Sequence, residues 1–233
     1  MITFIIVILL LLVELFHFYL IRVIGKGAFG KVHQVQHKRT LQEYALKCIH
    51  KSRCVELRAA NNMVAERRLL ERIDYPLVVN LRYAFQDDDH LFMVLDLMLG
   101  GDLRFQLERL GTLTEMQARF YVAQISLSLG YLHKRRIAHR DIKPDNILLD
   151  GNGHAHLSDF NIATQFNDKR PIRWTKAGSL AYMAPEILDK RGYATSVDWW
   201  SLGILAYELL FGRVSWQKKK TIHATIFLSW ILV

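Results

Sequence analysis

His139-Arg140-Asp141-Ile142-Lys143-Pro144-Asp145-Asn146 is the most informative segment of this chain. It brings a carboxylate, an amine and an amide together within a few residues, and the apolar run 147–149 follows it. A further carboxylate, Asp159, comes thirteen residues after Asn146 and precedes Phe160. Carboxylate and amide oxygens beside bound phosphates are typical ligands of Mg²⁺. The segment therefore predicts a metal and phosphate site. The alternative, a solvated charged surface loop, is disfavoured by the apolar residues that follow.

A glycine-rich segment lies upstream, with the sequence Gly25-Lys26-Gly27-Ala28-Phe29-Gly30-Lys31-Val32. Glycines let backbone amides approach phosphate oxygens without a side-chain clash. Dinucleotide-binding folds use the same spacing, but there the loop opens a helix. Here the residues after Gly30 continue as a strand, and no acidic residue follows on a second strand–helix–strand unit. The pattern favours a hairpin over a nucleotide, and a glycine hairpin without a ligand stays open as the alternative.

Lys47 lies in a predicted strand among Tyr44, Ala45, Leu46 and Ile49. An ammonium group in such apolar surroundings is poorly solvated unless it is paired. Glu66, on the helix expected next, is a ready partner. A Lys–Glu pair would hold the ammonium where it can meet the α- and β-phosphates of a nucleotide. An exposed lysine on an edge strand is the alternative.

Hydrophobic periodicity predicts a small sheet followed by a helical part. The expected strands cover 20–24, 31–36, 43–49, 81–86 and 91–97. One helix interrupts them at 58–73, where Asn62, Met63, Glu66, Leu69, Leu70 and Ile73 recur near helical spacing. Thr114 and Gln117 form a capping box that begins a helix ending near His133. Its expected apolar face carries Phe120, Leu127 and Tyr131. A second apolar helix covers 196–210, and Gly212 takes the C-cap position.

Composition excludes several classes of protein. Of the 233 residues 51% are apolar and 23% charged, which indicates a core-forming globular chain. The two cysteines, Cys48 and Cys54, exclude a disulfide scaffold and a cysteine-rich zinc module, and they suit a reducing, intracellular and cytoplasmic location. The formal charge of +9 would suit nucleic acid or an anionic membrane. No basic stripe interleaved with aromatic residues occurs, so we expect no nucleic-acid partner.

Both ends differ from the middle of the chain. Residues 2–13 are apolar apart from Thr3, yet a membrane span needs about 20 apolar residues. We therefore expect an alternative first exon or an artefact, with a membrane anchor as the less favoured reading. Residues 217–220 are polar or basic, and the tail 221–233 is mainly apolar. The expected organisation is an extension at 1–15, two lobes at 16–97 and 98–216, and an unmatched tail at 217–233.

Together these motifs, in this order, resemble the eukaryotic protein kinase family over residues 18–213. The dipeptide Lys143-Pro144, which follows Asp141, resembles the sequence found at this place in the serine/threonine branch of the family. Finer detail resembles the YANK family, which is grouped with the AGC kinases. The segments that carry this likeness are Phe85-Gln86-Asp87-Asp88-Asp89-His90, Asp96-Leu97-Met98-Leu99-Gly100-Gly101-Asp102-Leu103 and Asp159-Phe160-Asn161-Ile162-Ala163. Asn161 replaces the usual glycine, as in that family, and removes a flexible residue beside a metal ligand.

The resemblance implies an α+β bilobal fold, with a five-stranded antiparallel sheet and one helix in the N-lobe and a mostly helical C-lobe. It implies transfer of the ATP γ-phosphate to Ser or Thr hydroxyls of proteins, with Mg²⁺ as the metal. Asp141 would accept the hydroxyl proton, Lys143 would neutralise the γ-phosphate, and Lys47 with Glu66 would position the nucleotide. Asn146 and Asp159 would bind the metal. The implied nucleotide-binding residues are Ile24, Gly25, Lys26, Gly27, Ala28, Phe29, Gly30, Lys31, Val32, Ala45, Lys47, Leu95, Asp96, Met98, Asp102 and Leu148.

The family assigns finer roles to some of these positions. Leu95 would be the gatekeeper, Asp96 and Met98 the adenine-binding hinge, and Asp102 a neighbour of the ribose. Val32, Ala45 and Leu148 would sandwich the adenine. Leu70, Leu81, His139 and Phe160 would stack as a regulatory spine anchored by Asp198. Thr175 aligns with a phosphorylation site for an activating kinase, and Arg140 would receive that phosphate. The basic stretch around Thr175 and Ser179, which ends at Ala184-Pro185-Glu186, is expected to be ordered by phosphate.

The C-terminal part departs from the family pattern. A kinase C-lobe continues well past the helix that contains Asp198, and a late arginine pairs with the glutamate at the position of Glu186. Here only Arg191 and Arg213 follow Glu186, and both come too early. We therefore expect a truncated C-lobe, with the face of that helix around Trp199, Trp200, Leu205 and Leu209 uncovered, poor solubility and little transfer. A catalytically silent, nucleotide-binding interaction protein thus stays open as a second function.

Overall fold

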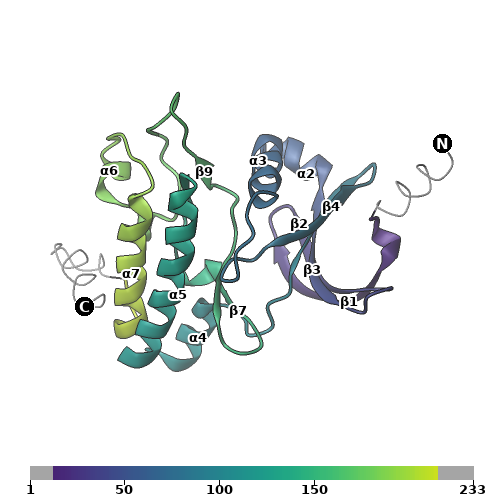
Figure 1. Cartoon of the computed structure of the whole chain (residues 1–233), viewed down its shortest axis with the longest axis horizontal. Coiled ribbons are helices and arrows are strands. Elements are labelled where there is room, and N and C mark those ends of the chain that lie inside the picture. The colour runs from purple at the N-terminus through teal and green to yellow at the C-terminus, as the bar shows by residue number, and fades with distance from the viewer. Residues whose placement is uncertain (1–12, 215–233) are drawn as a thin grey trace. The chain divides into compact units, whose positions relative to one another are not determined.

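The computed structural model describes residues 13–214, which form two compact units. The first contains the residues up to Asp74 together with 79–97, and the second contains 75–78 together with the chain from Met98 onward (Figure 1). The apolar run at 1–12 and the tail at 215–233 lie outside the described residues. No helix within residues 13–214 is long and apolar enough to cross a membrane.

The first unit is built on an antiparallel sheet with the strand order β1-β2-β3-β5-β4. Its strands are β1 (Phe18–Gly27), β2 (Gly30–His37), β3 (Glu43–His50), β4 (Leu81–Gln86) and β5 (His90–Asp96). All five expected strands are present. The first is longer than expected at both ends, because its pairing with β2 continues through the glycines until Gly27 faces Gly30. A short 3-10 helix, η1 (Leu15–His17), precedes the sheet.

The two faces of this sheet carry different sets of residues. On one face Phe18, Val35, Leu46, Phe92 and Val94 form a buried core. Strand alternation places Val32, Ala45, Lys47, Met93 and Leu95 on the opposite face, where Val32 pairs with Lys47 and Ala45 with Leu95 in register. The expected nucleotide-binding residues of these strands therefore share one side of the sheet.

The helical segment between β3 and β4 differs from the expectation of one helix over 58–73. It consists of α2 (Lys51–Glu56) and α3 (Ala60–Leu70), with Arg58 at φ +53° between them. The left-handed backbone of Arg58 interrupts the helix. Because Arg58 is neither glycine nor proline, the sequence carries no signal for this break. Met63, Glu66, Leu69 and Leu70 are buried as expected, whereas Asn62 is exposed.

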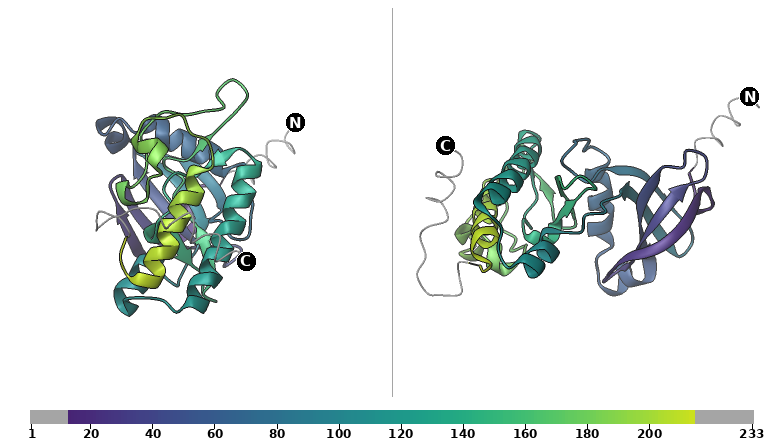
Figure 2. Two further views of the ribbon diagram at one scale, coloured as in Figure 1. Left: turned by 90° about the vertical axis from the view of Figure 1, so that its left-hand side faces the viewer. Right: turned by 90° about the horizontal axis from the view of Figure 1, so that it is seen from below.

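The second unit is mainly helical. Its helices are α4 (Leu103–Leu110), α5 (Glu115–Lys134), α6 (Pro185–Leu188) and α7 (Val197–Phe211), with two 3-10 turns, η2 (Pro144–Asn146) and η3 (Leu180–Tyr182). Two small antiparallel pairs join β6 (Ile137–Ala138) to β9 (Thr164–Gln165) and β7 (Ile147–Leu149) to β8 (Ala155–Leu157). Helices α5 and α7 lie side by side (Figure 2).

The start of α5 is the expected capping box. The Gln117 backbone N–H donates to Thr114 Oγ1 at 3.3 Å, and the Thr114 N–H donates to Gln117 Oε1 at 3.0 Å. The expected apolar face of this helix was wrong, because Phe120 is 45% exposed and Leu127 is 57% exposed. The buried positions are Ala118, Val122, Ile125, Ser128, Leu129 and Leu132. Their spacing of three and four residues defines the packed stripe, and Phe120 and Leu127 lie outside it.

Helix α7 is covered more completely than expected. Leu202, Leu205 and Leu209 are fully buried, and Trp199 and Trp200 are half-buried. The expectation of an uncovered apolar face was therefore wrong for Leu205 and Leu209, whereas the two tryptophans are only partly covered. Gly212 ends the helix at φ +67°, in the left-handed conformation expected of a C-cap glycine.

Candidate active site

Asp141 is the most constrained of the expected site residues. Its Oδ1 accepts hydrogen bonds from the Ser179 N–H at 2.9 Å and the Ser179 hydroxyl at 2.8 Å. Its Oδ2 accepts from Asn146 Nδ2 at 2.9 Å and pairs with Lys143 Nζ at 2.9 Å. Burial alone would raise the pKa of Asp141, but the hydrogen bonds from Lys143 and Ser179 hold that pKa below its ordinary value. The carboxylate is therefore ionised and fixed in orientation, as a proton acceptor requires.

Asn146 and Asp159 carry the oxygen atoms that the sequence predicts as metal ligands. Asn146 is buried, and its amide nitrogen donates to the Asp141 backbone carbonyl at 2.8 Å as well as to its carboxylate. The amide oxygen is the atom that this arrangement leaves for a cation. Asp159 is exposed and has φ +61°, and its Oδ1 accepts from the Asn161 N–H at 3.4 Å. Among residues 13–214 no group of three or more His, Cys, Asp or Glu side chains could hold a metal. Two protein ligands completed by phosphates and water are the usual coordination of Mg²⁺, so the donor set fits that ion.

Lys47 and Glu66 are in contact, as the sequence predicted. Lys47 Nζ lies 2.8 Å from Glu66 Oε1, and the two side chains are 22% and 2% exposed. The strand β3 carries the lysine and α3 carries the glutamate, so the pair joins the sheet to its helix. The ammonium stabilises the buried glutamate, because a carboxylate loses its hydration on burial.

The glycine-rich segment forms the end of β1 and the turn into β2. Its residues Ile24, Lys26, Ala28, Phe29 and Lys31 lie beside the three glycines in this hairpin. The glycines are not equivalent. A Cβ at Gly30 would lie 2.0 Å from the Cys48 carbonyl oxygen, whereas Cβ atoms at Gly25 and Gly27 would meet nothing closer than 3.6 Å and 4.0 Å. Gly30 is therefore needed by the sheet, whereas a Cβ at Gly25 or Gly27 would make only ordinary van der Waals contacts.

The expected hinge residues have side-chain partners of their own. The Asp96 carboxylate accepts two hydrogen bonds from Arg82, at 2.5 and 3.0 Å, and one from Asn80 Nδ2 at 3.0 Å. Asp102 caps α4, because its Oδ1 accepts from the Phe105 N–H at 2.7 Å. Leu95, Met98 and Leu148 are half-buried.

A buried carboxylate, Asp198 of α7, anchors the segment before Asp141. Its Oδ2 accepts from the His139 N–H at 2.9 Å and lies 2.8 Å from His133 Nε2, and its Oδ1 accepts from the Arg140 N–H at 2.8 Å. The His139 ring packs edge-on against Phe160 with ring centroids 5.0 Å apart. The two expected spine residues of this unit are thus in contact. Leu70 is buried and Leu81 half-buried in the other unit.

Thr175 and Arg140 also meet. Arg140 Nη1 donates to Thr175 Oγ1 at 3.2 Å and to the Tyr193 hydroxyl at 3.0 Å, while Arg140 Nε donates to the Ile162 carbonyl at 2.6 Å. Arg140 has φ +70°, a strained backbone that these contacts hold. Thr175, the expected phosphorylation site, and Arg140, which is expected to bind its phosphate, are therefore hydrogen-bonded in the unphosphorylated chain.

Sequence reasoning missed several partners of these residues. Ser179 was treated only as a hydroxyl in a basic stretch, although it bonds both Asp141 and Lys143 Nζ, the latter at 3.0 Å. The role of His133 beside Asp198 was missed as well. A third omission is the cluster of Arg104, Tyr182 and Glu208, where the Arg104 guanidinium pairs with Glu208. The members of each set are far apart in the sequence, so no local pattern indicates these contacts.

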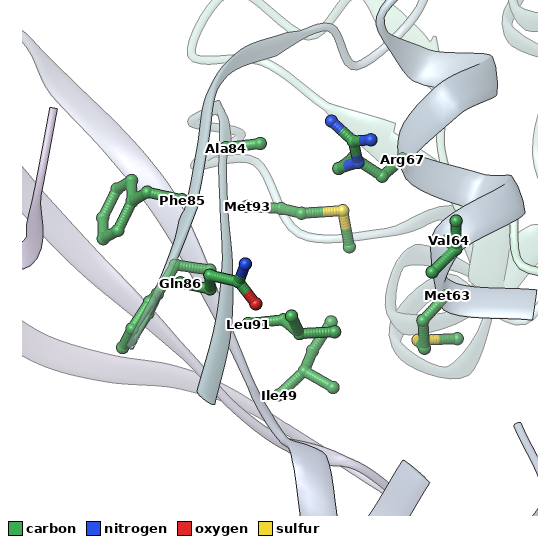
Figure 3. Close-up of a pocket in the computed structure, with 10 residues that line it drawn as sticks. Ile49, Met63, Val64, Arg67, Ala84, Phe85, Gln86, Leu91 and Met93 are labelled. Atoms are coloured by element: carbon green, nitrogen blue, oxygen red, sulfur yellow. The ribbon is translucent and has the colours of Figure 1, made fainter. Parts of the chain in front are cut away.

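A separate cavity of about 310 Å³ lies in the first unit, between α3 and the strands β4 and β5 (Figure 3). Met63, Val64 and Arg67 of α3 face Leu91 and Met93 across it. None of the expected site residues lines this cavity.

The fold and site match one family. Residues 18–230 match the protein kinase domain, so the chain belongs to the protein kinase family. The predicted α+β kinase fold with its five-stranded antiparallel sheet is confirmed.

The relatives are serine/threonine kinases. Serine/threonine-protein kinase 32C of Mus musculus is 48% identical over 201 residues, which cover 84% of this chain and 41% of the relative. Serine/threonine-protein kinase 32B of Homo sapiens is 47% identical over 201 residues, which cover 84% and 48%. The kinase AtPK1/AtPK6 of Arabidopsis thaliana is 45% identical over 196 residues, which cover 84% and 42%. The YANK resemblance is confirmed by the kinases of the 32 series. The chain spans less than half the length of these curated relatives.

Proposed function

We propose that this chain is a serine/threonine protein kinase that transfers the γ-phosphate of ATP to Ser or Thr hydroxyls of protein substrates. The observation that supports this most is the Asp141 carboxylate, held by donors from Ser179, Lys143 and Asn146. An ionised carboxylate in fixed orientation can accept the proton that a hydroxyl loses as it attacks phosphorus. Nucleic acid is not among the proposed partners.

Neighbouring residues would stabilise the negative charge of the phosphates. Lys143, which bonds both Asp141 and Ser179, would neutralise charge on the transferred phosphoryl group. Asn146 and Asp159 would hold Mg²⁺, which supplies charge neutralisation at the phosphate oxygens when it is bound.

The first unit would hold the nucleotide. The backbone N–H groups around Gly25 and Gly27 would approach the phosphates, and Lys47 would bind the α- and β-phosphates while Glu66 keeps its ammonium in place. Val32 and Ala45 of this unit would contact the adenine. Because the Asp96 side chain is already bonded to Arg82, the hinge contact would come from backbone atoms of residues 96–98.

Thr175 is the proposed target of an activating kinase. A phosphate there would lie beside the Arg140 guanidinium, which already contacts the threonine hydroxyl at 3.2 Å. Charge-assisted bonds to that phosphate would order the segment around it. A cytoplasmic location is part of the proposal, and it is supported by Cys48 and Cys54, which are both free thiols.

A silent nucleotide-binding protein is the second candidate, and one observation favours it. The half-buried Glu186 carboxylate makes no ion pair within the described part of the chain. The two functions are separated by measuring ATP binding and phosphate transfer on the same preparation. Binding with transfer to a Ser/Thr peptide supports the kinase, and binding without transfer supports the silent protein.

A further inference from the structure

A pair of histidines lies at one end of the sheet in the first unit, and neither is among the expected site residues. His50 ends β3 and His90 begins β5, and the two residues face each other in register. Their ring centroids are 4.5 Å apart, with 53° between the ring planes. Both rings are accessible, since His50 is exposed and the His90 side chain is 29% exposed. Two imidazoles that meet at a surface can bind one transition-metal ion together.

The spacing of the two rings suits a single metal ion. Zinc–nitrogen bonds of about 2.0–2.1 Å at a tetrahedral angle place two ligating nitrogens roughly 3.3 Å apart. Rings whose centroids lie 4.5 Å apart need only rotate about their side-chain bonds to reach that separation. The backbone need not move, because the ladder between β3 and β5 already sets the distance between His50 and His90.

Asp87 orients one of the two rings. Its Oδ1 lies 3.3 Å from His90 Nδ1 and accepts from the His90 backbone N–H at 2.6 Å. A carboxylate beside Nδ1 favours the tautomer with its proton on that atom, which leaves the lone pair of Nε2 for a metal. Such a carboxylate also makes the imidazole a stronger ligand. The alternative, a plain ion pair between Asp87 and a charged His90, gives the facing His50 ring no role.

The surroundings of the pair favour an ion that prefers nitrogen ligands. The His90 ring packs against the buried Phe92, with ring centroids 5.7 Å apart, which shields one side of the pair from water. Lys51 Nζ donates to the Asp87 carbonyl at 2.6 Å, and its charge opposes a cation, but the Asp87 carboxylate offsets that charge. Imidazole suits Zn²⁺ and related ions, whereas Mg²⁺ prefers oxygen ligands. The pair therefore differs in ion preference from Asn146 and Asp159.

We propose that His50 and His90 together bind a divalent transition-metal ion such as Zn²⁺, and that Asp87 is a positioning residue for His90. Within residues 13–214 no group of three His, Cys, Asp or Glu side chains could hold a metal, so water completes the coordination. The ion would join the end of β3 to the start of β5. Because the His50 N–H donates to the Phe29 carbonyl at 2.9 Å, the ion would also restrain the turn of the glycine-rich hairpin. Every contact lies in the first unit, so the inference stands apart from the proposed function.

The site is tested by titrating Zn²⁺ into the full chain in a calorimeter, with Mg²⁺ in excess to occupy oxygen sites. The unaltered chain should bind Zn²⁺, and Asp87→Asn, which keeps an acceptor for the His90 N–H, should weaken that binding about tenfold. His50→Gln and His90→Gln each remove a ligand and should weaken it more. Zn²⁺ should raise the melting temperature of the unaltered chain and leave that of His50→Gln unchanged. A glutamine variant that does not fold is replaced by asparagine at the same position.

Two variants serve as controls. His154→Gln removes an exposed histidine of the second unit, and Cys48→Ser removes a thiol of β3. Burial raises the pKa of Cys48 to about 11, so this thiol stays protonated and is a poor ligand. Both controls should bind Zn²⁺ as the unaltered chain does. No Zn²⁺ binding by the unaltered chain, equal affinity in His50→Gln or His90→Gln, or loss of binding in either control would overturn the site. Unchanged affinity in Asp87→Asn would overturn the positioning role.

Discussion

Ser179 donates two hydrogen bonds to Asp141 Oδ1, one from its backbone N–H at 2.9 Å and one from its hydroxyl at 2.8 Å. The same hydroxyl accepts from Lys143 Nζ at 3.0 Å. Ser179 therefore links the proposed proton acceptor to the proposed phosphate-binding lysine. Ser179 lies 38 residues after Asp141 in the sequence. The orientation of the Asp141 carboxylate therefore depends on the position of the segment that carries Ser179.

Ser179→Ala removes the hydroxyl but keeps the backbone donor. We expect kcat to fall about tenfold with little change in KM for ATP, because the lost bond positions Asp141 rather than the nucleotide. Steady-state kinetics measures both constants. Ser179→Thr keeps the hydroxyl and should retain most of kcat, and an equal loss in the alanine and threonine variants would contradict the assigned role.

The lowered pKa of Asp141 has a consequence for stability. The pKa of Asp141 is lower in the folded state, so ionisation of this carboxylate adds to the free energy of unfolding. That contribution is present above the ordinary pKa of 3.8 and is lost as the pH falls through the pKa of the folded state. Urea unfolding of the unaltered chain and of Asp141→Asn should give a stability difference that is constant above about pH 5 and shrinks below pH 4. A difference that grows as the pH falls would contradict the lowered pKa.

Lys47→Met and Glu66→Gln should not act independently. Each single change leaves one charged partner without the other, whereas the double variant removes both charges. We expect a coupling of about 1–3 kcal/mol in a double-mutant cycle of unfolding free energies. ATP affinity, measured by calorimetry on the same four proteins, should fall similarly in all three variants. Additive stability effects would mean that the two side chains do not interact energetically.

The glycines of the β1–β2 hairpin should divide into two kinds. Gly30→Ala should lower the melting temperature, because its Cβ would lie 2.0 Å from the Cys48 carbonyl oxygen. Gly27→Ala is the matched control, since its Cβ meets nothing closer than 4.0 Å. That control should keep the melting temperature and weaken ATP binding. Loss of stability in Gly27→Ala, or none in Gly30→Ala, would contradict the assignment.

The sequence predicted those features that follow from local chemistry. A lysine in an apolar strand needs a partner, which led to Glu66, and period-two alternation located all five strands. A capping box needs only Thr114 and Gln117, and these lie three residues apart. Each of these signals is contained within one or two elements.

Features that depend on distant or atypical contacts could not be predicted. Ser179 and Asp141 are 38 residues apart, and Arg104 and Glu208 are 104 apart. The break between α2 and α3 occurs at Arg58, where neither glycine nor proline marks it. On α5 Phe120, Leu127 and Tyr131 were expected to share one face, whereas the buried stripe lies at other positions of the helix and includes the small residues Ala118 and Ser128.

The central claim is that Asp141 accepts the hydroxyl proton in phosphate transfer. The most direct measurement is label transfer from γ-labelled ATP to a Ser/Thr peptide by the chain and by Asp141→Asn, with ATP affinity measured on both. The account predicts transfer by the unaltered chain, a loss of at least about a thousandfold in the variant, and ATP affinities that agree within about threefold. Equal transfer by both proteins, or ATP binding by the unaltered chain with no transfer at all, would contradict it.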